Sequence, residues 1–255
     1  AGTAAGKGNT MKRAWYLGYA ADAVGDRAIL IGDPDRVDRI AELLDMPTFL
    51  PVSRGLKSVT GIYKGKTVTV AAFGMGAPIA TIVLHELADL GLTRFLRIGT
   101  AMYYPPAQGG DFIISSSALG FEGTSSSYLQ SDAPYPADVA LIAALHDAAT
   151  AAGQSVRDGL YATYDAFYRD MFGMDEAGRE RAAENRKMLE QKGVMAVDME
   201  TSALLAAGNA LRVACATLCL GTVDALTQEK IEPATLARGE KHLFEIALSG
   251  LCALD

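Results

Sequence analysis

Short apolar runs alternate with longer segments of helical period from residue 28 nearly to the end of this 255-residue chain. Residues 28–31 are too few for a helix, and the turn Gly32-Asp33-Pro34 closes the run before apolar residues recur at helical spacing. Strands that alternate with helices assemble into an α/β fold, in which the helices cover the faces of a sheet. No repeat and no Pro/Ser-rich linker divides the chain. We therefore predict one α/β domain over residues 13–255, behind a disordered tail of residues 1–12.

The same pattern predicts the individual elements. It predicts strands over residues 28–31, 67–73, 94–98, 111–115, 159–163, 194–197 and 213–220. It predicts helices after Pro34 and over residues 79–90, 139–152, 175–191, 199–210 and 238–251. Residues 120–136 are rich in Gly, Ser and Pro and predict a mobile loop. Lys64-Gly65-Lys66 predicts a hairpin turn, because the stretch from Gly61 is one residue short of a phosphate-loop spacing and precedes a strand.

Composition excludes several classes of protein. Half of the residues are hydrophobic and 21% are charged, which is typical of a globular domain and not of a disordered chain or a coiled coil. The net charge of −7 argues against a nucleic-acid-binding surface, because such surfaces depend on clustered Lys and Arg. No apolar run is long enough to span a membrane, and no signal peptide is recognisable, so we expect a soluble cytoplasmic protein.

The cysteines and histidines predict neither a disulfide nor a metal site. The three cysteines are odd in number and lie in apolar surroundings, which favours reduced thiols in the core. The three histidines are scattered without the spacing of metal ligands. We therefore expect no metal.

Two strand ends carry residues suited to an anion. In Gly32-Asp33-Pro34-Asp35-Arg36, a glycine and a helix N-terminus follow a buried strand, and their free N–H groups stabilise negative charge. A tight turn with a solvated Arg36 is the alternative. In Arg97-Ile98-Gly99-Thr100, an arginine lies inside an apolar strand, where it needs an anionic partner. That partner is either a bound carboxylate or phosphate, or a structural ion pair.

Three carboxylates follow later strands. Asp198 and Glu200 open a helix, where they either complement the helix dipole or accept hydrogen bonds from sugar hydroxyls. Asp224 ends another apolar run. It is either a solvated turn residue or a general acid whose pKa is raised by burial.

Six motifs occur in the order and with the spacing of one family. They are Gly32-Asp-Pro-Asp-Arg36-Val, Gly74-Met-Gly76-Ala-Pro78, Leu96-Arg97-Ile-Gly-Thr100, Asp165-Ala-Phe167-Tyr168, Val197-Asp-Met199-Glu200 and Asp224. The chain thus resembles the nucleoside phosphorylase family that contains uridine phosphorylase and the hexameric bacterial purine nucleoside phosphorylases. The resemblance implies a single-domain, three-layer α/β/α fold with a mixed central sheet, assembled from dimers and usually a hexamer. It also implies reversible phosphorolysis, in which nucleoside and phosphate give free base and ribose 1-phosphate, with no metal or organic cofactor.

The resemblance also implies roles for residues of this chain. Its phosphate site consists of Gly32, Arg36, Arg97, Thr100 and, from a neighbouring subunit, Arg54. Its nucleoside site consists of Tyr16, Met75, Phe167, Val197, Asp198, Met199 and Glu200, with Glu200 on the sugar hydroxyls and Phe167 near the base. Asp224 and Arg238 are the implied catalytic residues, an acid that protonates a purine and an arginine that assists it. Arginines suit this chemistry, because they hold phosphate against the anomeric carbon while charge develops on the ribose and the base.

Departures from the family pattern bear on the substrate. Met171 and Gly173 stand where uridine phosphorylases carry a glutamine and an arginine that read uracil, whereas Asp224 stands where the purine enzymes carry an aspartate. We therefore predict a purine nucleoside, with uridine as the alternative. Other departures are Tyr16 for a histidine, Ile79 for a serine, Ala101-Met102 for a glycine-containing pair and Asp198 for a glutamate.

Two further functions stay open at this point. A hydrolase of the same superfamily would use water as the nucleophile, but the arginines at positions 36, 54 and 97 favour phosphate, since water needs no arginine cluster. A nucleoside-binding protein without turnover is the second, and the departures around the expected site motivate it.

Overall fold

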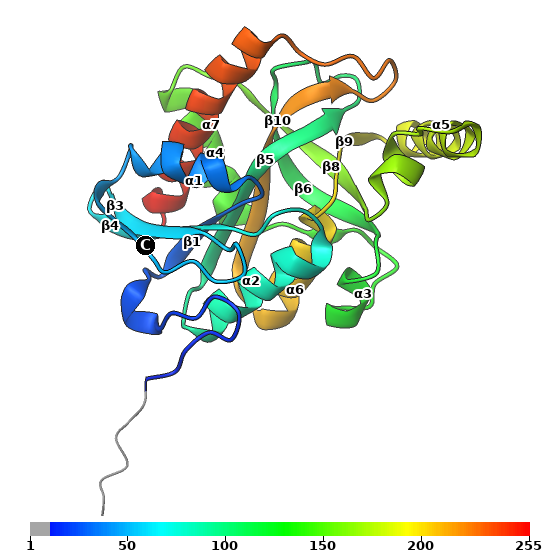
Figure 1. Cartoon of the computed structure of the whole chain (residues 1–255). Helices are drawn as coiled ribbons and strands as arrows, with labels where there is room; N and C mark the ends of the chain where they lie inside the picture. Colours follow the sequence, from blue (N-terminus) through cyan, green and yellow to red (C-terminus); the bar gives the residue numbers. More distant parts are fainter. Residues whose placement is uncertain (1–10) are drawn as a thin grey trace, which may run out of the picture.

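A mixed sheet of ten strands organises the protein, which is described here by a computed structural model of residues 11–255 (Figure 1). The strands are β1 (Arg27–Ile31), β2 (Asp45–Phe49), β3 (Ser58–Tyr63), β4 (Lys66–Ala72), β5 (Arg94–Tyr103), β6 (Phe112–Phe121), β7 (Tyr135–Pro136), β8 (Val156–Tyr164), β9 (Val194–Asp198) and β10 (Ala214–Asp224). Their order is β10-β6-β8-β9-β5-β1-β4-β3-β2, with β7 paired to β6. Parallel and antiparallel pairs both occur. The predicted α/β class with a mixed sheet is confirmed.

Strand β5 connects two parts of this sheet. Its first half pairs in parallel with β1, and its end pairs in antiparallel with β9 at Met102 and Tyr103. Because β5 also pairs along its length with β10, the strands β10, β6, β8, β9 and β5 close into a ring. The chain pattern predicted only residues 94–98 of β5, since the second half includes glycine and polar residues that do not read as a buried strand.

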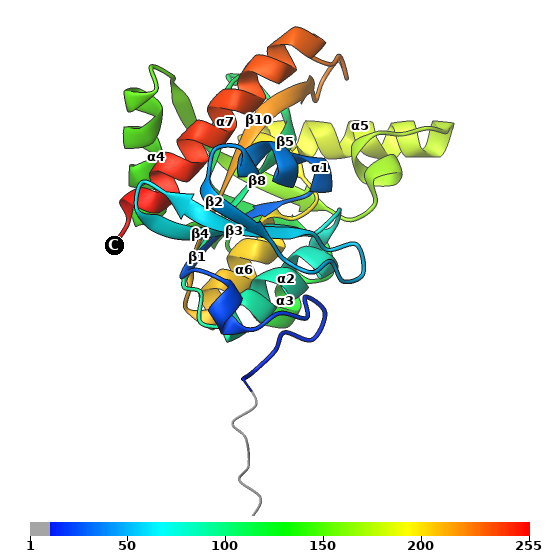
Figure 2. The same ribbon diagram turned by 60° about the vertical axis from the view of Figure 1, so that its left-hand side comes forward.

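Helices cover both faces of the sheet. They are α1 (Pro34–Ala41), α2 (Ala77–Asp89), α3 (Ser125–Tyr128), α4 (Val139–Ala151), α5 (Glu176–Gln191), α6 (Thr201–Leu211) and α7 (Pro233–Ala253). α4 packs on α7 at one face, and α2 packs on α6 at the other (Figures 1 and 2). α5 projects from the body in both views, in keeping with its mostly charged sequence and its three buried residues. Two short helical turns complete the chain, η1 (Ala21–Ala23) and the π-type turn η2 (Phe167–Met171).

Several predicted elements have other bounds in the structure. Residues 120–136 are not a loop throughout, because they include the end of β6, all of α3 and β7. Two side chains order this segment: the Glu122 carboxylate accepts hydrogen bonds from the Ser125 amide and the Ser202 hydroxyl, and the Tyr135 hydroxyl donates to the Leu129 carbonyl. α7 begins at Pro233, where the pattern placed its start at residue 238. Strands β2 and β3 were missed, and β2, at the edge of the sheet, is exposed at every residue.

Two further expectations concern the N-terminal tail and the membrane. The predicted tail of residues 1–12 lies, up to residue 10, outside the described residues. In residues 11–255, no helix is both long and apolar enough to cross a membrane.

The functional side chains are expected where the parallel strands end. β1, β4, β5 and β10 run in the same direction, so their carboxyl ends meet at one edge of the sheet. Open sheets of this kind bind ligands beyond these ends. The motifs singled out in the sequence follow these strands directly.

Candidate functional site

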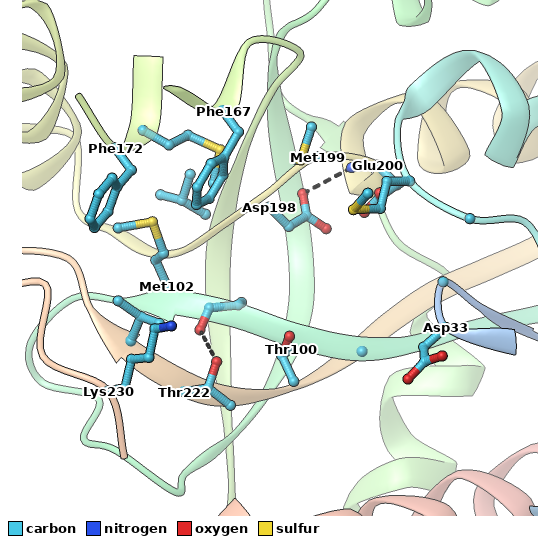
Figure 3. A pocket seen from close by; sticks show the side chains of 18 of the residues that line it. Asp33, Thr100, Met102, Phe167, Phe172, Asp198, Met199, Glu200, Thr222 and Lys230 are labelled. Carbon is cyan, nitrogen blue, oxygen red and sulfur yellow. Dashed lines mark hydrogen bonds between the residues drawn. The ribbon is translucent and has the colours of Figure 1, made fainter. Parts of the chain in front are cut away.

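A cavity of about 890 Å³ opens at the carboxyl ends of the central strands (Figure 3). It brings together ten of the fourteen residues that the resemblance selects, although they come from distant parts of the chain. These are Gly32, Arg36, Met75, Arg97, Thr100, Phe167, Val197, Asp198, Met199 and Glu200. Tyr16, Arg54, Asp224 and Arg238 do not line it.

Gly32 brings two of the strand ends close together. The Gly74 amide donates to the Gly32 carbonyl at 3.0 Å. A Cβ on Gly32 would lie 2.8 Å from the Gly74 carbonyl oxygen, which is too close for any side chain. The next residue, Asp33, accepts a hydrogen bond from the Asp35 amide and caps α1. The turn therefore fixes a helix N-terminus at the cavity wall.

Arg97 is the buried cation of the site. Its Nη1 lies 3.1 Å from Asp198 Oδ2, and its Nη2 donates to Glu200 Oε2 at 2.7 Å. Nη1 also lies 2.9 Å from the Cys219 sulfur, whereas Nε is buried and has no hydrogen-bond partner among the described residues. Burial lowers the pKa of Arg97, but Cys219 and the two carboxylates raise it well above its ordinary value. Arg97 thus forms the structural ion pair that was one of the two alternatives from the sequence, and its Nε–H donor has no acceptor among the described residues.

The two carboxylates beside Arg97 differ in how many hydrogen bonds they accept from the rest of the protein. Asp198 accepts hydrogen bonds from the Thr163 hydroxyl at 2.8 Å, from the Thr201 amide at 3.2 Å and from the Thr201 hydroxyl. It thus binds the first residue of α6 and leaves little capacity for a ligand. Glu200 accepts from Arg97 and from the Gly76 amide at 2.8 Å. Burial raises the pKa of Glu200 above its ordinary value, although Arg97 opposes this.

Arg36 is also paired. Its Nε donates to Glu240 Oε2 at 2.9 Å, and Arg39 binds the same carboxylate. Burial raises the pKa of Glu240, but the hydrogen bonds from the two arginines outweigh this and lower it. Arg36 therefore reaches the cavity from a network that joins α1 to α7, and is not the solvated turn residue of the alternative interpretation.

The other end of the cavity is mostly apolar. Phe167 and Phe172 stack with ring centroids 6.0 Å apart and an interplanar angle of 4°. Met102 and Met171 line the same cavity, and Figure 3 shows Met102 below the two phenylalanines. Gly173 carries no side chain into this end, because a Cβ there would lie 2.1 Å from the Arg179 amide nitrogen. The structure therefore explains why no arginine occupies that position.

Sequence reasoning missed several residues that line this end. They are Phe172, Thr222, Gln228 and Lys230, whereas Met102 was noted only as a departure from the family pattern. Phe172 lies shortly after the Asp165–Tyr168 motif, Thr222 lies within β10, and Gln228 and Lys230 follow that strand, so proximity to a motif or to an apolar run was the available signal. Polar residues such as Gln228 and Lys230, in a connection without Gly or Pro, show no spacing pattern from which a site could be predicted.

The two proposed catalytic residues lie outside the cavity. Asp224 Oδ1 accepts hydrogen bonds from the amides of Leu226 at 2.8 Å and Thr227 at 3.1 Å, which is the arrangement of a turn aspartate. Arg238 lies exposed on α7 and donates to the Thr235 hydroxyl at 3.3 Å. In this chain neither side chain contacts the space in which a base would lie.

Tyr16 and Arg54 lie together, away from the cavity. The Arg54 guanidinium carbon is 4.8 Å from the centre of the Tyr16 ring. Trp15 and Val52 beside them are exposed at 86% and 60%. Exposed apolar residues gathered around an arginine are typical of a protein–protein interface.

Comparisons with known proteins agree on one family. A family model described as the phosphorylase superfamily matches residues 26–248. Uridine phosphorylase of Salmonella typhimurium is 34% identical over 228 residues, covering 87% of this chain and 89% of the relative. A solved structure of uridine phosphorylase from Vibrio fischeri is 30% identical, with a TM-score of 0.81 over 95% of this chain and 97% of the other. Purine nucleoside phosphorylase from Toxoplasma gondii shares the fold, with a TM-score of 0.84 over 96% and 97% of the two chains at 23% identity.

Proposed function

The chain belongs to the phosphorylase superfamily and is a pentosyltransferase of the nucleoside phosphorylase type, with inorganic phosphate as co-substrate; from this premise we propose that it cleaves uridine. The relatives named above that cover most of the chain at 30% identity or more are uridine phosphorylases. The purine preference predicted from Asp224 has no such support, and Asp224 caps a turn outside the cavity. Inosine or guanosine is the second candidate, favoured by Met171 at the position where uridine phosphorylases carry a polar residue that reads uracil.

We propose that phosphate binds between Gly32, Arg97 and Thr100. The unpartnered, buried Nε of Arg97 is the observation that carries this assignment, because a buried donor without an acceptor is costly unless a ligand supplies one. The N-terminus of α1 adds its dipole, and Arg36 lines the same space. Arg97 holds its two carboxylates at the same time, so they neutralise it in the absence of phosphate.

The proposed reaction uses the two ends of the cavity in sequence. Glu200 accepts hydrogen bonds from the ribose hydroxyls and positions the anomeric carbon beside the phosphate. A phosphate oxygen then bonds to that carbon as the carbon–nitrogen bond breaks, and the electron pair leaves with the base. The base afterwards takes up a proton. Phe167 and Phe172 supply an apolar surface on which the base lies.

We also propose that a second copy of the chain completes the site with Arg54 and Tyr16. Coexpression of Arg54→Ala with Glu200→Gln tests this, because a mixed dimer then contains one site with both residues intact. With random pairing, about a quarter of the wild-type activity is expected, far above either variant alone. Activity no greater than the mean of the two variants contradicts a shared site, and light scattering of the purified protein reports whether it is a dimer or a hexamer.

The experiment for the reaction itself is base release from uridine, inosine, guanosine and adenosine, each with and without phosphate. Phosphate-dependent release is expected, with uridine the fastest and ribose 1-phosphate as the second product. Equal release without phosphate identifies a hydrolase. Tight nucleoside binding with no release under either condition identifies a binding protein.

A further inference from the structure

Three cations line the cavity, and they differ in what holds them. Arg97 pairs with Asp198 and Glu200, and Arg36 pairs with Glu240. The third is Lys230, which lines the cavity and makes no ion pair and no side-chain hydrogen bond with any residue between 11 and 255. Within the described part of the chain, it is the one cation of the cavity without an ion-pair partner.

Lys230 lies at the end away from the proposed phosphate site. Figure 3 shows it beside Thr222, on the side of Met102 and Phe172, whereas Asp33 lies at the opposite side. The three carboxylates of the cavity, Asp33, Asp198 and Glu200, are all separated from Lys230 in this view. A ligand group near Lys230 therefore meets a positive charge that none of these three carboxylates neutralises.

A short hairpin fixes Lys230 in this place. Lys230 pairs with Val223 in an antiparallel bridge, and the Ile231 amide donates to the Thr222 carbonyl at 3.0 Å. The Asp224 amide donates to the Glu229 carbonyl at 2.9 Å across the same hairpin. The Asp224 side chain caps the turn between them. Lys230 is thus carried on a hydrogen-bonded connection that continues strand β10.

The polar side chains around Lys230 are suited to oxygen acceptors. The Gln228 amide nitrogen donates weakly to the Met171 carbonyl at 3.4 Å, and the Thr222 hydroxyl donates to the Ala101 carbonyl at 3.5 Å. Both contacts are long, so both donors are available to a ligand. A base with carbonyl oxygens matches this set, whereas the amino group of adenine meets a cation and has no carboxylate to bind.

We propose that Lys230 binds a carbonyl oxygen of the base and stabilises the negative charge that the base acquires as it leaves. This inference rests on the proposed phosphorolysis. As the phosphate oxygen bonds to the anomeric carbon, the electron pair of the carbon–nitrogen bond spreads onto the ring and its carbonyl oxygen, beside the Lys230 ammonium. The base takes its proton from water. The site consequently selects uracil or a 6-oxopurine over adenine.

The test compares Lys230→Met with Lys230→Arg and with a control, Lys187→Met, in the full-length protein. Lys187 is exposed on α5 and does not line the cavity. Each variant is assayed with the better substrate of uridine and inosine, and with its derivative that has a more readily leaving base, 5-fluorouridine or 7-methylinosine. Thermal unfolding of each variant verifies that the fold is retained.

We expect Lys230→Met to lower kcat for the parent nucleoside by about 100-fold, the usual effect of removing one group that stabilises transition-state charge. The loss should be several-fold smaller for the better leaving group, which needs less stabilisation. The KM for phosphate should stay unchanged, Lys230→Arg should retain most of the activity, and Lys187→Met should behave as wild type. Free uracil or hypoxanthine should also bind more weakly to Lys230→Met in calorimetry.

Two kinds of failure are distinguishable. If the wild-type protein releases no base in a phosphate-dependent manner, the proposed function is wrong. If the wild type is active but Lys230→Met loses less than about threefold, or loses equally with both leaving groups, or binds phosphate more weakly, the role assigned to Lys230 is wrong while the phosphorolysis stands.

Discussion

At one end of the cavity Arg97 lies within strand β5 and pairs with Asp198 and Glu200 at the end of β9, and all three are buried. At the other end Phe172, Gln228 and Lys230 lie on connecting segments. The first group is held by the ring of strands that includes β5 and β9. The second depends on η2 and on the hairpin that follows β10. A buried charge must be matched when the protein folds, so its partners are part of the fold. Side chains on connections change without this constraint, so under the proposed function we expect substrate choice to depend on that end.

The comparison is tested most severely by Arg97→Ala. Removal of the guanidinium leaves Asp198 and Glu200 buried without their cation, at a cost of about 3–5 kcal/mol in the free energy of unfolding. It also removes the proposed phosphate donor, so kcat/KM for phosphate should fall by about 1,000-fold or more. Denaturant unfolding and phosphate-dependent kinetics measure the two effects.

Arg27→Ala is the matched control for this change. Arg27 is 2% exposed, donates to the carbonyls of Leu251 and Leu254, and does not line the cavity. It should lose stability without any change in the KM for phosphate of the folded fraction. A rise in this KM with Arg27→Ala would mean that loss of stability alone explains the effect at Arg97.

Glu200→Gln removes one of the two carboxylates paired with Arg97 and, with it, the proposed sugar contact, and a smaller effect is expected. The ionised carboxylate is needed to accept from two ribose hydroxyls, so kcat/KM for the nucleoside should fall by about 100-fold. Burial raises the pKa of Glu200. As the pH falls, the wild type should therefore begin to lose activity at a higher pH than it would if Glu200 had an ordinary pKa. Full activity is expected above that pKa, and protonation below it should remove the acceptor.

The pH profile of Glu200→Gln is the decisive measurement. The acidic limb should disappear in this variant, and it should persist in Glu122→Gln, which alters a carboxylate that orders the segment after β6. An acidic limb that survives in Glu200→Gln assigns the titration to another group.

The sequence predicted the end of the cavity that contains Arg97 and Glu200 better than the end that contains Lys230. Arg97 was recognisable as a charged residue inside an apolar strand, and Glu200 as one just after an apolar run. The motif order then indicated a family, which the comparisons confirm. The fold class followed from the alternation of runs. The ring closure of β5 with β10 and β9 did not, because strand pairing between distant segments leaves no local periodicity. Lys230 was missed for a related reason: an exposed lysine in a polar connection is ordinary until the fold places it at a cavity.

Asp224 provides the smallest expected effect and separates two explanations of the same residue. As a turn cap, Asp224 holds the hairpin that carries Lys230 through two hydrogen bonds from main-chain amides. An asparagine oxygen can accept both bonds, so Asp224→Asn should change kcat by no more than about twofold, whereas Asp224→Ala should cost about 1 kcal/mol of stability and lower kcat a few-fold. If Asp224 were instead a general acid, Asp224→Asn should be as inactive as Asp224→Ala, because asparagine cannot release a proton. Steady-state kinetics of the two variants with uridine and inosine therefore decide whether this carboxylate supports the connection that binds the base or takes part in the chemistry itself.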